Sequence, residues 1–408
     1  MQVGWMKIVQ VNTVCGSGSV GRIVVDLYKT AEEAGHVSLA AYGRGSAPEG
    51  IEGYLIGNKA DFYCHVLRNF FKGESGFGSG KVTERFLSWL EEQKPDLIHL
   101  HNIHGFYLQV EKLFDYLKKS GIPVVWTLHD CWPFTGHCAY FDYAGCDKWK
   151  TGCYHCMQHV KAYPYAIFKD NSKEAYLDKK KAFCGVKNLT IVTPSKWLAK
   201  LVEQSFLGEY PVRVIPNGID LSAFHPMEET ETDSSKKIVL GVANIWEARK
   251  GLGYFEQLAE ILPEEYQIVL VGLNNSQKKA LEKKYDTGRL MPLTRTGSVK
   301  ELAALYTRAD VYVNLTLEDN FPTTNLEALA CGTPVVTFDT GGSPEALQKD
   351  CGFVVTKGDL EGVARAITTL TQKQKPVEAC LARALDFDKK KRFQEYLELY
   401  KQVKKENL

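Results

Sequence analysis

The stretch LEDNFPTTNLEALACGTPVV, residues 317–336, combines a polar loop, the start of a helix and a hydrophobic strand in one short run. Thr324 and Glu327 fit the capping box, in which a Thr side chain and a Glu three residues later bind free amides at a helix start. The alternative is that the loop and helix start hold a ligand, with Asp319 and Glu327 as candidate contacts. The rest of the chain has to decide between these two interpretations.

Strands alternate with helices along the whole chain, which indicates parallel sheets. KIVQVNTV (7–14) is the first predicted strand, and the pattern restarts with KIVLGVAN (237–244). Between them, the polar run at 225–237 is typical of a surface linker. We therefore expect an α/β protein made of two Rossmann-like halves in tandem. The expected segments are a first domain at 1–212, a second domain at 213–385 and a C-terminal helix at 386–408 that crosses back to the first domain.

The composition, with 44% hydrophobic and 24% charged residues, is that of an ordinary globular protein. A formal net charge of +1 gives no reason to expect a nucleic-acid partner. The first residues lack the apolar core of a cleavable signal, and no stretch approaches the roughly 18 apolar residues that span a bilayer. We expect a cytoplasmic protein without a membrane span.

Gly16, Gly18 and Gly21 match the pattern G-x-G-x-x-G between a predicted strand and a predicted helix. Glycines let backbone amides approach a phosphate, and a helix N-terminus adds about half a positive charge. The next strand ends at Arg44, without the acidic residue that binds the ribose of NAD. An NADP-dependent oxidoreductase therefore stays open as an alternative function. A glycine-rich turn without a ligand is the plainer interpretation.

Arg249 and Lys250 stand where a predicted strand of the second half passes into the next helix. Two cations beside a helix N-terminus suit a diphosphate, and two solvated surface cations are the alternative. The loop and helix start further along offer backbone amides, and Glu327 could bind hydroxyl groups. Both segments follow strands at the carboxyl edge of a parallel sheet, where open α/β sheets bind ligands.

Five motifs are spread across nearly the whole chain. They are TLHD (127–130), TPSKW (193–197), VIPNGID (214–220), RKGL (249–252) and EDNFPTTNLEALACGTPVV (318–336). In order and spacing they resemble glycosyltransferase family 4. The resemblance implies the GT-B fold, in which two Rossmann-like domains face a cleft, with an N-terminal acceptor domain and a C-terminal nucleotide-sugar-binding domain.

The sequence is similar to those of bacterial enzymes of capsule and exopolysaccharide assembly. The resemblance implies a hexosyltransferase that uses a nucleotide sugar, a UDP- or GDP-sugar, and retains the anomeric configuration. Its acceptor would be a glycan or a lipid-linked glycan of surface polysaccharide biosynthesis. The family requires no metal or other cofactor for catalysis.

The resemblance also assigns roles to single residues. Lys250 matches the family's phosphate-binding lysine, and Glu327 matches the glutamate that binds the donor ribose. Asp319 stands where the family has another glutamate, close to the donor sugar. His129 matches a histidine that contacts the transferred sugar. His129, Asp319 and Lys250 are therefore the expected catalytic residues.

A second set of residues is expected to bind the donor. Asn244 stands where the family has a phosphate-binding arginine, and Arg249 is the candidate replacement. The backbone at 295–297 corresponds to a segment that contacts the nucleotide base. The expected donor-binding residues are Gly16, Gly18, Asn244, Arg249, Lys250, Phe321, Thr323, Thr324, Asn325 and Glu327.

Cys138, Cys146, Cys153 and Cys156 fall within a predicted insertion at 131–160. The chain has eleven cysteines, an odd number, and no secretion signal, so a disulfide framework is not expected. Four thiolates in so short a run match a structural Zn²⁺ site that is closed to catalysis. Reduced, partly buried cysteines are the alternative. A non-catalytic, zinc-bearing binding protein is the third functional hypothesis.

Residues 60–73 repeat apolar positions at helical spacing, which is typical of a helix that faces the core. The alternative is an interfacial helix, which would bring the protein to the inner face of a membrane as a peripheral partner of a lipid-linked acceptor. His99 and His101 lie on one face of a predicted strand, where they could line a cleft or bind a metal.

Overall fold

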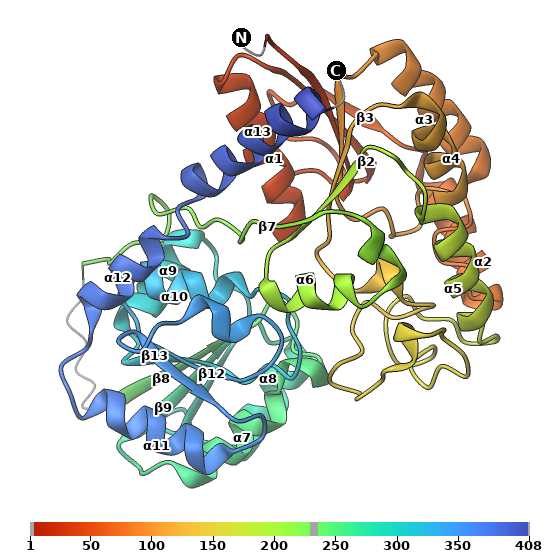
Figure 1. The fold of residues 1–408 in the computed structure, drawn as a ribbon. Coiled ribbons are helices and arrows are strands. Elements are labelled where there is room, and N and C mark those ends of the chain that lie inside the picture. Colours follow the sequence, from red (N-terminus) through yellow and green to blue (C-terminus); the bar gives the residue numbers. More distant parts are fainter. Residues whose placement is uncertain (1–3, 229–235, 407–408) are drawn as a thin grey trace. The chain divides into compact units, whose positions relative to one another are not determined.

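The computed structural model describes residues 4–228 and 236–406, and it divides into two compact units (Figure 1). The linker predicted at 225–237 falls mostly at 229–235, which lies outside the described residues. The first unit comprises residues 1–215 and 393–408, and the second comprises residues 216–392.

The first unit is built on a seven-stranded sheet in the order β3-β2-β1-β4-β5-β6-β7, and all neighbouring strands are parallel. Its strands are β1 (Lys7–Val14), β2 (Val37–Arg44), β3 (Gly53–Leu55), β4 (Leu97–Leu100), β5 (Val124–Thr127), β6 (Leu189–Thr193) and β7 (Val212–Val214). The central strands β4, β5 and β6 are buried along their whole length. This burial is typical of a parallel sheet that is covered on both faces.

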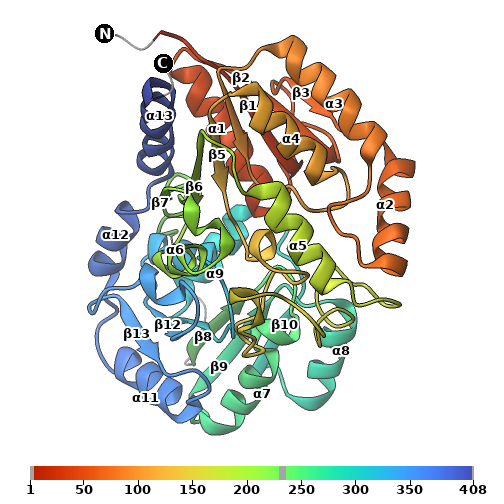
Figure 2. The same ribbon diagram turned by 45° about the vertical axis from the view of Figure 1, so that its right-hand side comes forward.

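Helices cover both faces of this sheet (Figure 2). They are α1 (Gly18–Glu33), α2 (Lys59–Lys72), α3 (Gly80–Gln93), α4 (Val110–Ser120), α5 (Ser172–Phe183), α6 (Lys196–Glu203) and α13 (Lys389–Glu406), with 3₁₀ turns η1 (Trp132–Phe134), η2 (Lys148–Lys150) and η3 (Phe206–Glu209). Because side chains alternate along a strand, Ile8 packs with residues of α1 and α13, whereas Val9 packs with residues of α3 and α4. Phe393 and Tyr400 of α13 lie in the same buried cluster as Ile8, so the C-terminal helix packs into the core of the first unit.

The second unit contains a six-stranded parallel sheet in the order β10-β9-β8-β11-β12-β13. Its strands are β8 (Lys237–Val242), β9 (Tyr266–Val271), β10 (Leu290–Leu293), β11 (Val311–Asn314), β12 (Val335–Phe338) and β13 (Gly352–Val355). Its helices are α7 (Leu252–Ile261), α8 (Asn275–Lys284), α9 (Val299–Arg308), α10 (Thr323–Ala330), α11 (Leu360–Thr371) and α12 (Val377–Leu385), with 3₁₀ turns η4 (Ala248–Lys250) and η5 (Ser343–Ala346). Val239 packs on the side of α7 and α11, and Leu240 on the side of α9 and α10.

The strand order reverses at the same place in both sheets. β1 lies beside β4 in the first sheet and β8 lies beside β11 in the second. At such a topological switch point, the loops that leave the carboxyl ends of the two strands diverge and open a ligand-binding crevice. Each unit therefore has one position at which its topology favours a ligand.

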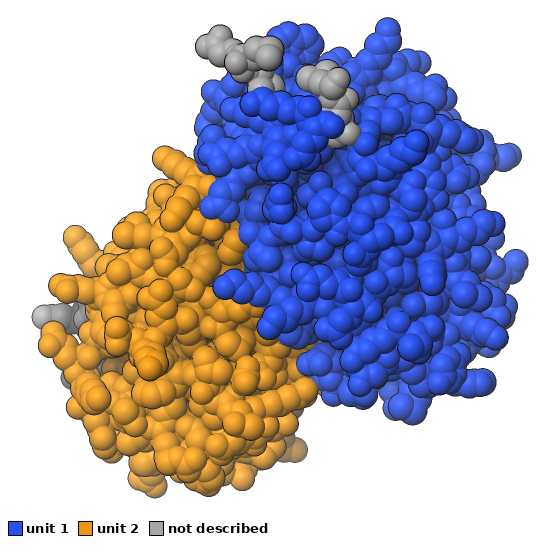
Figure 3. Space-filling model, viewed as in Figure 1, with its two compact units in different colours: residues 1–215, 393–408 blue, residues 216–392 orange. Residues whose placement is uncertain are grey.

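The predicted domain boundary lies too early. β7 pairs with β6, with Val212 next to Ile191, so this strand belongs to the first sheet. The second unit therefore begins at Pro216 instead of residue 213, and the chain returns to the first unit at Phe393 (Figure 3).

Helix α2 faces the core with only half of its apolar positions: Phe62, Val66 and Phe70 are partly buried. Its buried residues are His65 and Asn69, whereas Tyr63, Leu67 and Phe71 are 61%, 56% and 53% exposed. The spacing identified the helix, but periodicity alone cannot say in which direction its apolar face points. None of the helices in the described ranges is long and apolar enough to cross a bilayer.

Candidate functional site

The switch point of the second sheet holds two cations and a carboxylate. Arg249 and Lys250 lie in η4 after β8, and Asp319 lies in the loop after β11. The Lys250 Nζ donates a hydrogen bond to Oδ2 of Asp319, and Nη1 of Arg249 lies 3.8 Å from the same oxygen. Their side chains stay partly open to solvent, at 24% for Lys250, 13% for Arg249 and 15% for Asp319.

Backbone contacts hold the two loops of this cluster together. The amide of Leu317 donates to the carbonyl of Arg249 at 2.8 Å, and Nη1 of Arg249 donates to the carbonyl of Glu318 at 2.6 Å. Gly251 has a φ of 78°, and a Cβ there would lie 2.2 Å from the carbonyl oxygen of Leu315. Only glycine fits this turn, so the sequence fixes the close approach of the two loops.

The electrostatics keep the Asp319 carboxylate ionised. Burial raises the pKa of Asp319, but the charges of Lys250 and Arg249 lower it by more, so the pKa lies below its ordinary value. The ammonium of Lys250 has three N–H donors, and Asp319 accepts from one of them. The cluster can therefore hold its cations in place and still offer donors to an anionic ligand.

Glu327 is held by a tyrosine and is not part of a capping box. Helix α10 begins at Thr323, with Pro322 as N-cap and no side-chain cap, so Thr324 lies inside the helix. Oε2 of Glu327 accepts from the hydroxyl of Tyr306 at 2.9 Å, and Oε1 accepts from Oγ1 of Thr323 at 3.5 Å. The capping interpretation is therefore wrong, because the chain enters the helix one residue before Thr324.

The phenol of Tyr306 keeps its proton. Burial and the carboxylate of Glu327 hold the pKa of Tyr306 well above its ordinary value. The Tyr306 hydroxyl therefore donates to Glu327 and fixes the direction of its carboxylate. Tyr306 lies on α9, and the local pattern of the sequence gave no sign of its role.

Two of the expected donor-binding side chains make contacts within the interior of the second unit. Asn325 is fully buried, accepts from Nδ2 of Asn314 at 2.8 Å and donates to the carbonyl of Ser343 at 3.2 Å. Phe321 is 4% exposed and packs against Phe387, with ring centroids 5.6 Å apart. Any ligand contact of these two residues must come from their backbone.

Arg295 contacts Asn244, the residue that stands where the family has a phosphate-binding arginine. Its Nη2 donates to Oδ1 of Asn244 at 2.9 Å. Asn244 follows β8 and Arg295 follows β10, and β9 lies between these two strands. The sequence predicted only backbone contacts at 295–297, because pairing between residues so far apart leaves no local pattern.

The glycine loop occupies the corresponding position of the first sheet. It follows β1, and α1 begins at Gly18 without a side-chain cap. The amide of Gly16 donates to the carbonyl of Gly21 at 2.9 Å, which closes the loop. Gly16 and Gly18 have φ values of 77° and 67°, and no atom lies within 4 Å of a Cβ built on Gly18. The predicted arrangement of strand, glycine loop and helix is present.

A chain of histidines lies beside the loop, at the ends of β4 and β5. Nδ1 of His101 lies 3.1 Å from Nε2 of His129, and Nε2 of His101 lies 3.3 Å from Oε1 of Gln10. The amide nitrogen of Gln10 donates to Val24, so Oε1 is its acceptor. His101 therefore donates from Nε2 and accepts at Nδ1, and the neutral His129 has its proton on Nε2 and its acceptor at Nδ1.

These histidines are neutral at physiological pH. Burial is the main cause, and it lowers the pKa of His99 to about 3, that of His129 to about 4 and that of His101 well below its ordinary value. His99 is fixed by the Tyr400 hydroxyl at 2.6 Å and by Oγ1 of Thr127 at 2.8 Å. The alternating spacing predicted that His99 and His101 share a face, and their rings lie 4.0 Å apart.

Three cysteines of the insertion are engaged in close contacts within it. The Cys138 thiol donates to Sγ of Cys156, which helps to lower the pKa of Cys156 to about 7. The amide of Gly136 donates to Sγ of Cys153 at 3.1 Å. Within residues 4–228 and 236–406, no three His, Cys, Asp or Glu side chains are arranged to hold a metal ion. Zinc binding by Cys138, Cys146, Cys153 and Cys156 stays a prediction, which a metal analysis of the purified protein would test.

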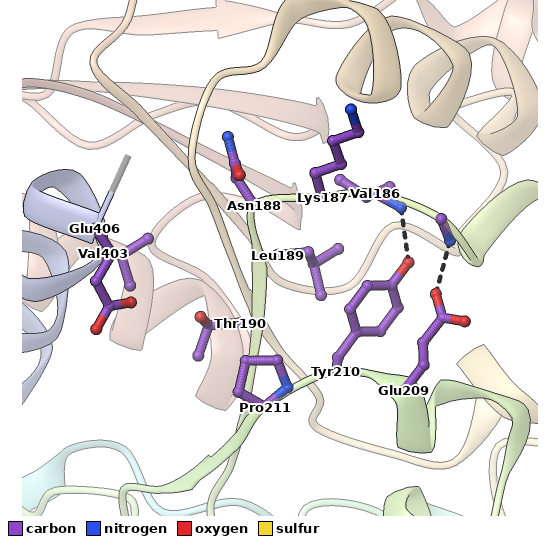
Figure 4. A pocket seen from close by; sticks show the side chains of 11 residues that line it. Val186, Lys187, Asn188, Leu189, Thr190, Glu209, Tyr210, Pro211, Val403 and Glu406 are labelled. Carbon is purple, nitrogen blue, oxygen red and sulfur yellow. Dashed lines mark hydrogen bonds between the residues drawn. The ribbon is translucent and has the colours of Figure 1, made fainter. Parts of the chain in front are cut away.

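A cavity of about 540 Å³ lies at the opposite end of the first sheet (Figure 4). Tyr210 and Glu209 accept hydrogen bonds there from the amides of Val186 and Gly185. Its lining comes from the segments that lead into β6 and β7, from the first residues of β6 and from α13, so the cavity lies at the amino ends of these strands and away from the switch point. It is lined by Gly185, Val186, Lys187, Asn188, Leu189, Thr190, Glu209, Tyr210, Pro211, Val403 and Glu406.

Both units match known protein families. Residues 20–223 match the family described as Glycosyltransferase Family 4, and residues 236–373 match the family described as Glycosyl transferases group 1. WcaC of Escherichia coli K12, a protein named as a colanic acid biosynthesis glycosyl transferase, is 25% identical to this chain over 383 residues. That alignment covers 87% of this chain and 88% of WcaC.

Solved structures agree with this fold. The chain aligns with sucrose-phosphate synthase from Thermosynechococcus elongatus at a TM-score of 0.73 and 16% identity, over 98% of this chain and 99% of that one. HepE of Anabaena in complex with UDP-glucose aligns at a TM-score of 0.63 and 16% identity, over 97% and 99%. The predicted fold, with two Rossmann-like units of the GT-B type, is thereby confirmed.

Proposed function

We propose, on the premise that the chain belongs to glycosyltransferase family 4, that it transfers a hexose from a nucleotide sugar to a glycan or lipid-linked glycan. The product would be part of a surface polysaccharide, and the reaction would retain the anomeric configuration without a catalytic metal. The enzyme would act in the cytoplasm or at the inner face of the membrane. The observation that carries the proposal is the cluster of Arg249, Lys250 and Asp319 at the switch point of the second sheet.

This cluster suits the leaving group of the reaction. When the bond between the sugar C1 and the diphosphate breaks, negative charge develops on the β-phosphate. Lys250 and Arg249 can stabilise that charge, and a preorganised donor of this kind contributes roughly 3–4 kcal/mol to the transition state. Asp319 holds both cations before the donor arrives. The acceptor hydroxyl would attack C1 on the same face and pass its proton to the departing phosphate oxygen, so we assign no protein nucleophile.

Glu327 and Tyr306 support the ribose contact. Tyr306 donates to Oε2 of Glu327 at 2.9 Å, and Thr323 makes a longer contact of 3.5 Å to Oε1, so the carboxylate is held at the start of α10, where a ribose hydroxyl would bind. A carboxylate fixed by one buried donor keeps its direction when a ligand binds.

His129 suits a sugar hydroxyl. Its low pKa keeps the imidazole neutral, and the hydrogen bonds of His101 make Nδ1 of His129 an acceptor. We assign Nδ1 of His129 to a hydroxyl group of the transferred sugar.

Thermal unfolding with UDP, GDP, ADP or NADP tests the proposal. A ligand at about 100 times its dissociation constant adds about 2.7 kcal/mol to the free energy of unfolding. We expect one nucleoside diphosphate to raise the melting temperature and NADP to leave it unchanged. A shift with NADP alone would contradict the proposal and favour a dinucleotide site at Gly16 and Gly18.

A further inference from the structure

Helix α2 of the first unit presents an apolar stripe to solvent. Tyr63, Leu67 and Phe71 are spaced four residues apart, which places them along one face of a helix. Each of these side chains is more than half exposed. Figure 2 shows α2 at the edge of the first unit, away from the sheet. The stripe therefore contributes little to the core of this chain.

The segment after Pro164 extends the stripe. Phe168 is 65% exposed and its ring stacks on that of Phe71, with centroids 4.9 Å apart and planes 14° apart. The amides of Ile167 and Phe168 donate to the carbonyl of Phe70 at 3.1 and 3.4 Å. Helix and loop thus form one surface. We name Tyr63, Leu67, Phe71, Ile167 and Phe168 the α2 patch.

The inward side of α2 is mixed, with buried His65 and Asn69 beside the partly buried Phe62, Val66 and Phe70. His65 lies 2.9 Å from Oγ of Ser79 and accepts from the amide of Gly78 at 3.2 Å. Nδ2 of Asn69 donates to the carbonyls of Pro164 and Tyr165 at 3.1 and 2.9 Å. A helix whose whole apolar face covered a core would also turn Tyr63, Leu67 and Phe71 inward. These three side chains are exposed instead and can meet a partner outside the chain.

The two segments that form the α2 patch also carry exposed basic residues. Segments 59–74 and 154–169 contain the basic residues Lys59, Arg68, Lys72, Lys161 and Lys169 and only the acidic residues Asp61 and Glu74. Both acids are engaged: Asp61 accepts from the amide of Asn58, and Glu74 pairs with Arg68. With five basic and two acidic residues, the two segments carry a formal charge of +3, against +1 for the whole chain.

We propose that the α2 patch docks the chain peripherally on a membrane that contains anionic lipids. Aromatic and aliphatic side chains would enter the boundary between headgroups and acyl chains, and the lysines would meet lipid phosphates. A protein partner or a second copy of this chain would not require these exposed lysines. The docking goes beyond the proposed transfer reaction and does not rest on it, because it concerns binding alone.

Flotation of the full chain with vesicles tests the proposal. We expect binding to vesicles of equal parts phosphatidylcholine and phosphatidylglycerol, weaker binding to phosphatidylcholine alone, and release by salt. The double variant Leu67→Ser, Phe71→Ser should lower the affinity about tenfold or more, because both side chains are lost from the interface. Leu385→Ser is the matched control, because Leu385 is 60% exposed in the second unit.

The unfolding temperature and the response to nucleoside diphosphates show whether each variant is folded. Equal binding of the double variant and the wild type would overturn the proposal, as would no binding by the wild type. Sedimentation of the protein alone adds a further arm. Self-association that the double variant abolishes, without vesicle binding, would make the patch an interface between copies of the chain and would also overturn the proposal.

Discussion

The two sheets share one topology but present opposite chemistry at their switch points. After β8 and β11, the second sheet gathers Arg249, Lys250 and an ionised Asp319. After β1 and β4, the first sheet presents a glycine loop and neutral histidines. The topology thus determines where a ligand can bind, and the side chains determine which ligand it is. Cations suit a diphosphate, and neutral imidazoles suit sugar hydroxyls.

Removal of Lys250 from the switch point of the second sheet should have the largest effect, and that effect is on donor turnover. We expect Lys250→Ala to slow release of nucleoside diphosphate from the donor about 10²–10³-fold, because a preorganised donor to the leaving group is lost. The assay is donor turnover at saturating acceptor. Lys300→Ala is the control, because Lys300 is an exposed lysine of the same unit outside the cluster. Unchanged turnover in Lys250→Ala would remove the lysine from the mechanism.

Acid should destabilise the first unit before the second. The histidines whose pKa is lowered in the described chain all lie in the first unit, so the unfolded state binds more protons below pH 6.5. Their stabilising effect is present above pH 6.5 and is lost as the pH falls toward their folded pKa values. Each fully shifted histidine changes the free energy of unfolding by about 1.4 kcal/mol per pH unit.

Hydrogen exchange at pH 7 and pH 5, corrected for the intrinsic rate, should show a loss of protection in β4 and β5 and little change in β8 and β11. His99→Gln should flatten the pH dependence, and His225→Gln, in an exposed segment of the second unit, should not. Equal losses of protection in both units would contradict the expected difference in their response to acid.

Loss of the Tyr306 hydroxyl should have a smaller effect. Tyr306→Phe leaves Oε2 of Glu327 without its buried donor, and a hydrogen bond of this kind contributes about 1 kcal/mol. We expect the affinity for the nucleoside diphosphate, measured by calorimetry, to fall about fivefold. Tyr254→Phe is the control within the same unit. A full loss of binding would mean that Tyr306 contacts the ligand itself.

The smallest expected effects come from single alanine substitutions in the glycine turns of the two switch points. Gly18 and Gly251 both have positive φ, but a Cβ on Gly18 meets open space, whereas one on Gly251 meets the carbonyl of Leu315. Gly18→Ala should cost about 1–2 kcal/mol of stability from backbone strain alone and weaken nucleoside diphosphate binding less than Gly251→Ala does, because it displaces no neighbouring atom. Gly251→Ala should cost more and weaken binding, because it displaces Lys250. Denaturant unfolding and calorimetry of both variants would test this, and equal effects would contradict it.

Much of the fold was predictable because it follows from periodicity and from the handed packing of strands and helices. The proximity of Arg249, Lys250 and Asp319 also followed, since all three leave carboxyl ends of neighbouring strands. The contact between Arg295 and Asn244 did not, because nothing in either local segment specifies the other. The capping-box prediction was wrong because the helix already begins at Thr323, with Pro322 as its N-cap. The orientation of α2 was only partly predictable, because an apolar stripe looks the same in sequence whether it faces a core or solvent.

The central claim is that the switch point of the second sheet binds a nucleoside diphosphate. The most direct test is hydrogen exchange of the full chain with and without the nucleoside diphosphate that stabilises it. We expect the ligand to bring new protection to the loops at 243–251 and 317–327. In Lys250→Ala we expect this protection to be lost. Protection confined to the glycine loop at 16–21, with the second unit unchanged, would contradict it.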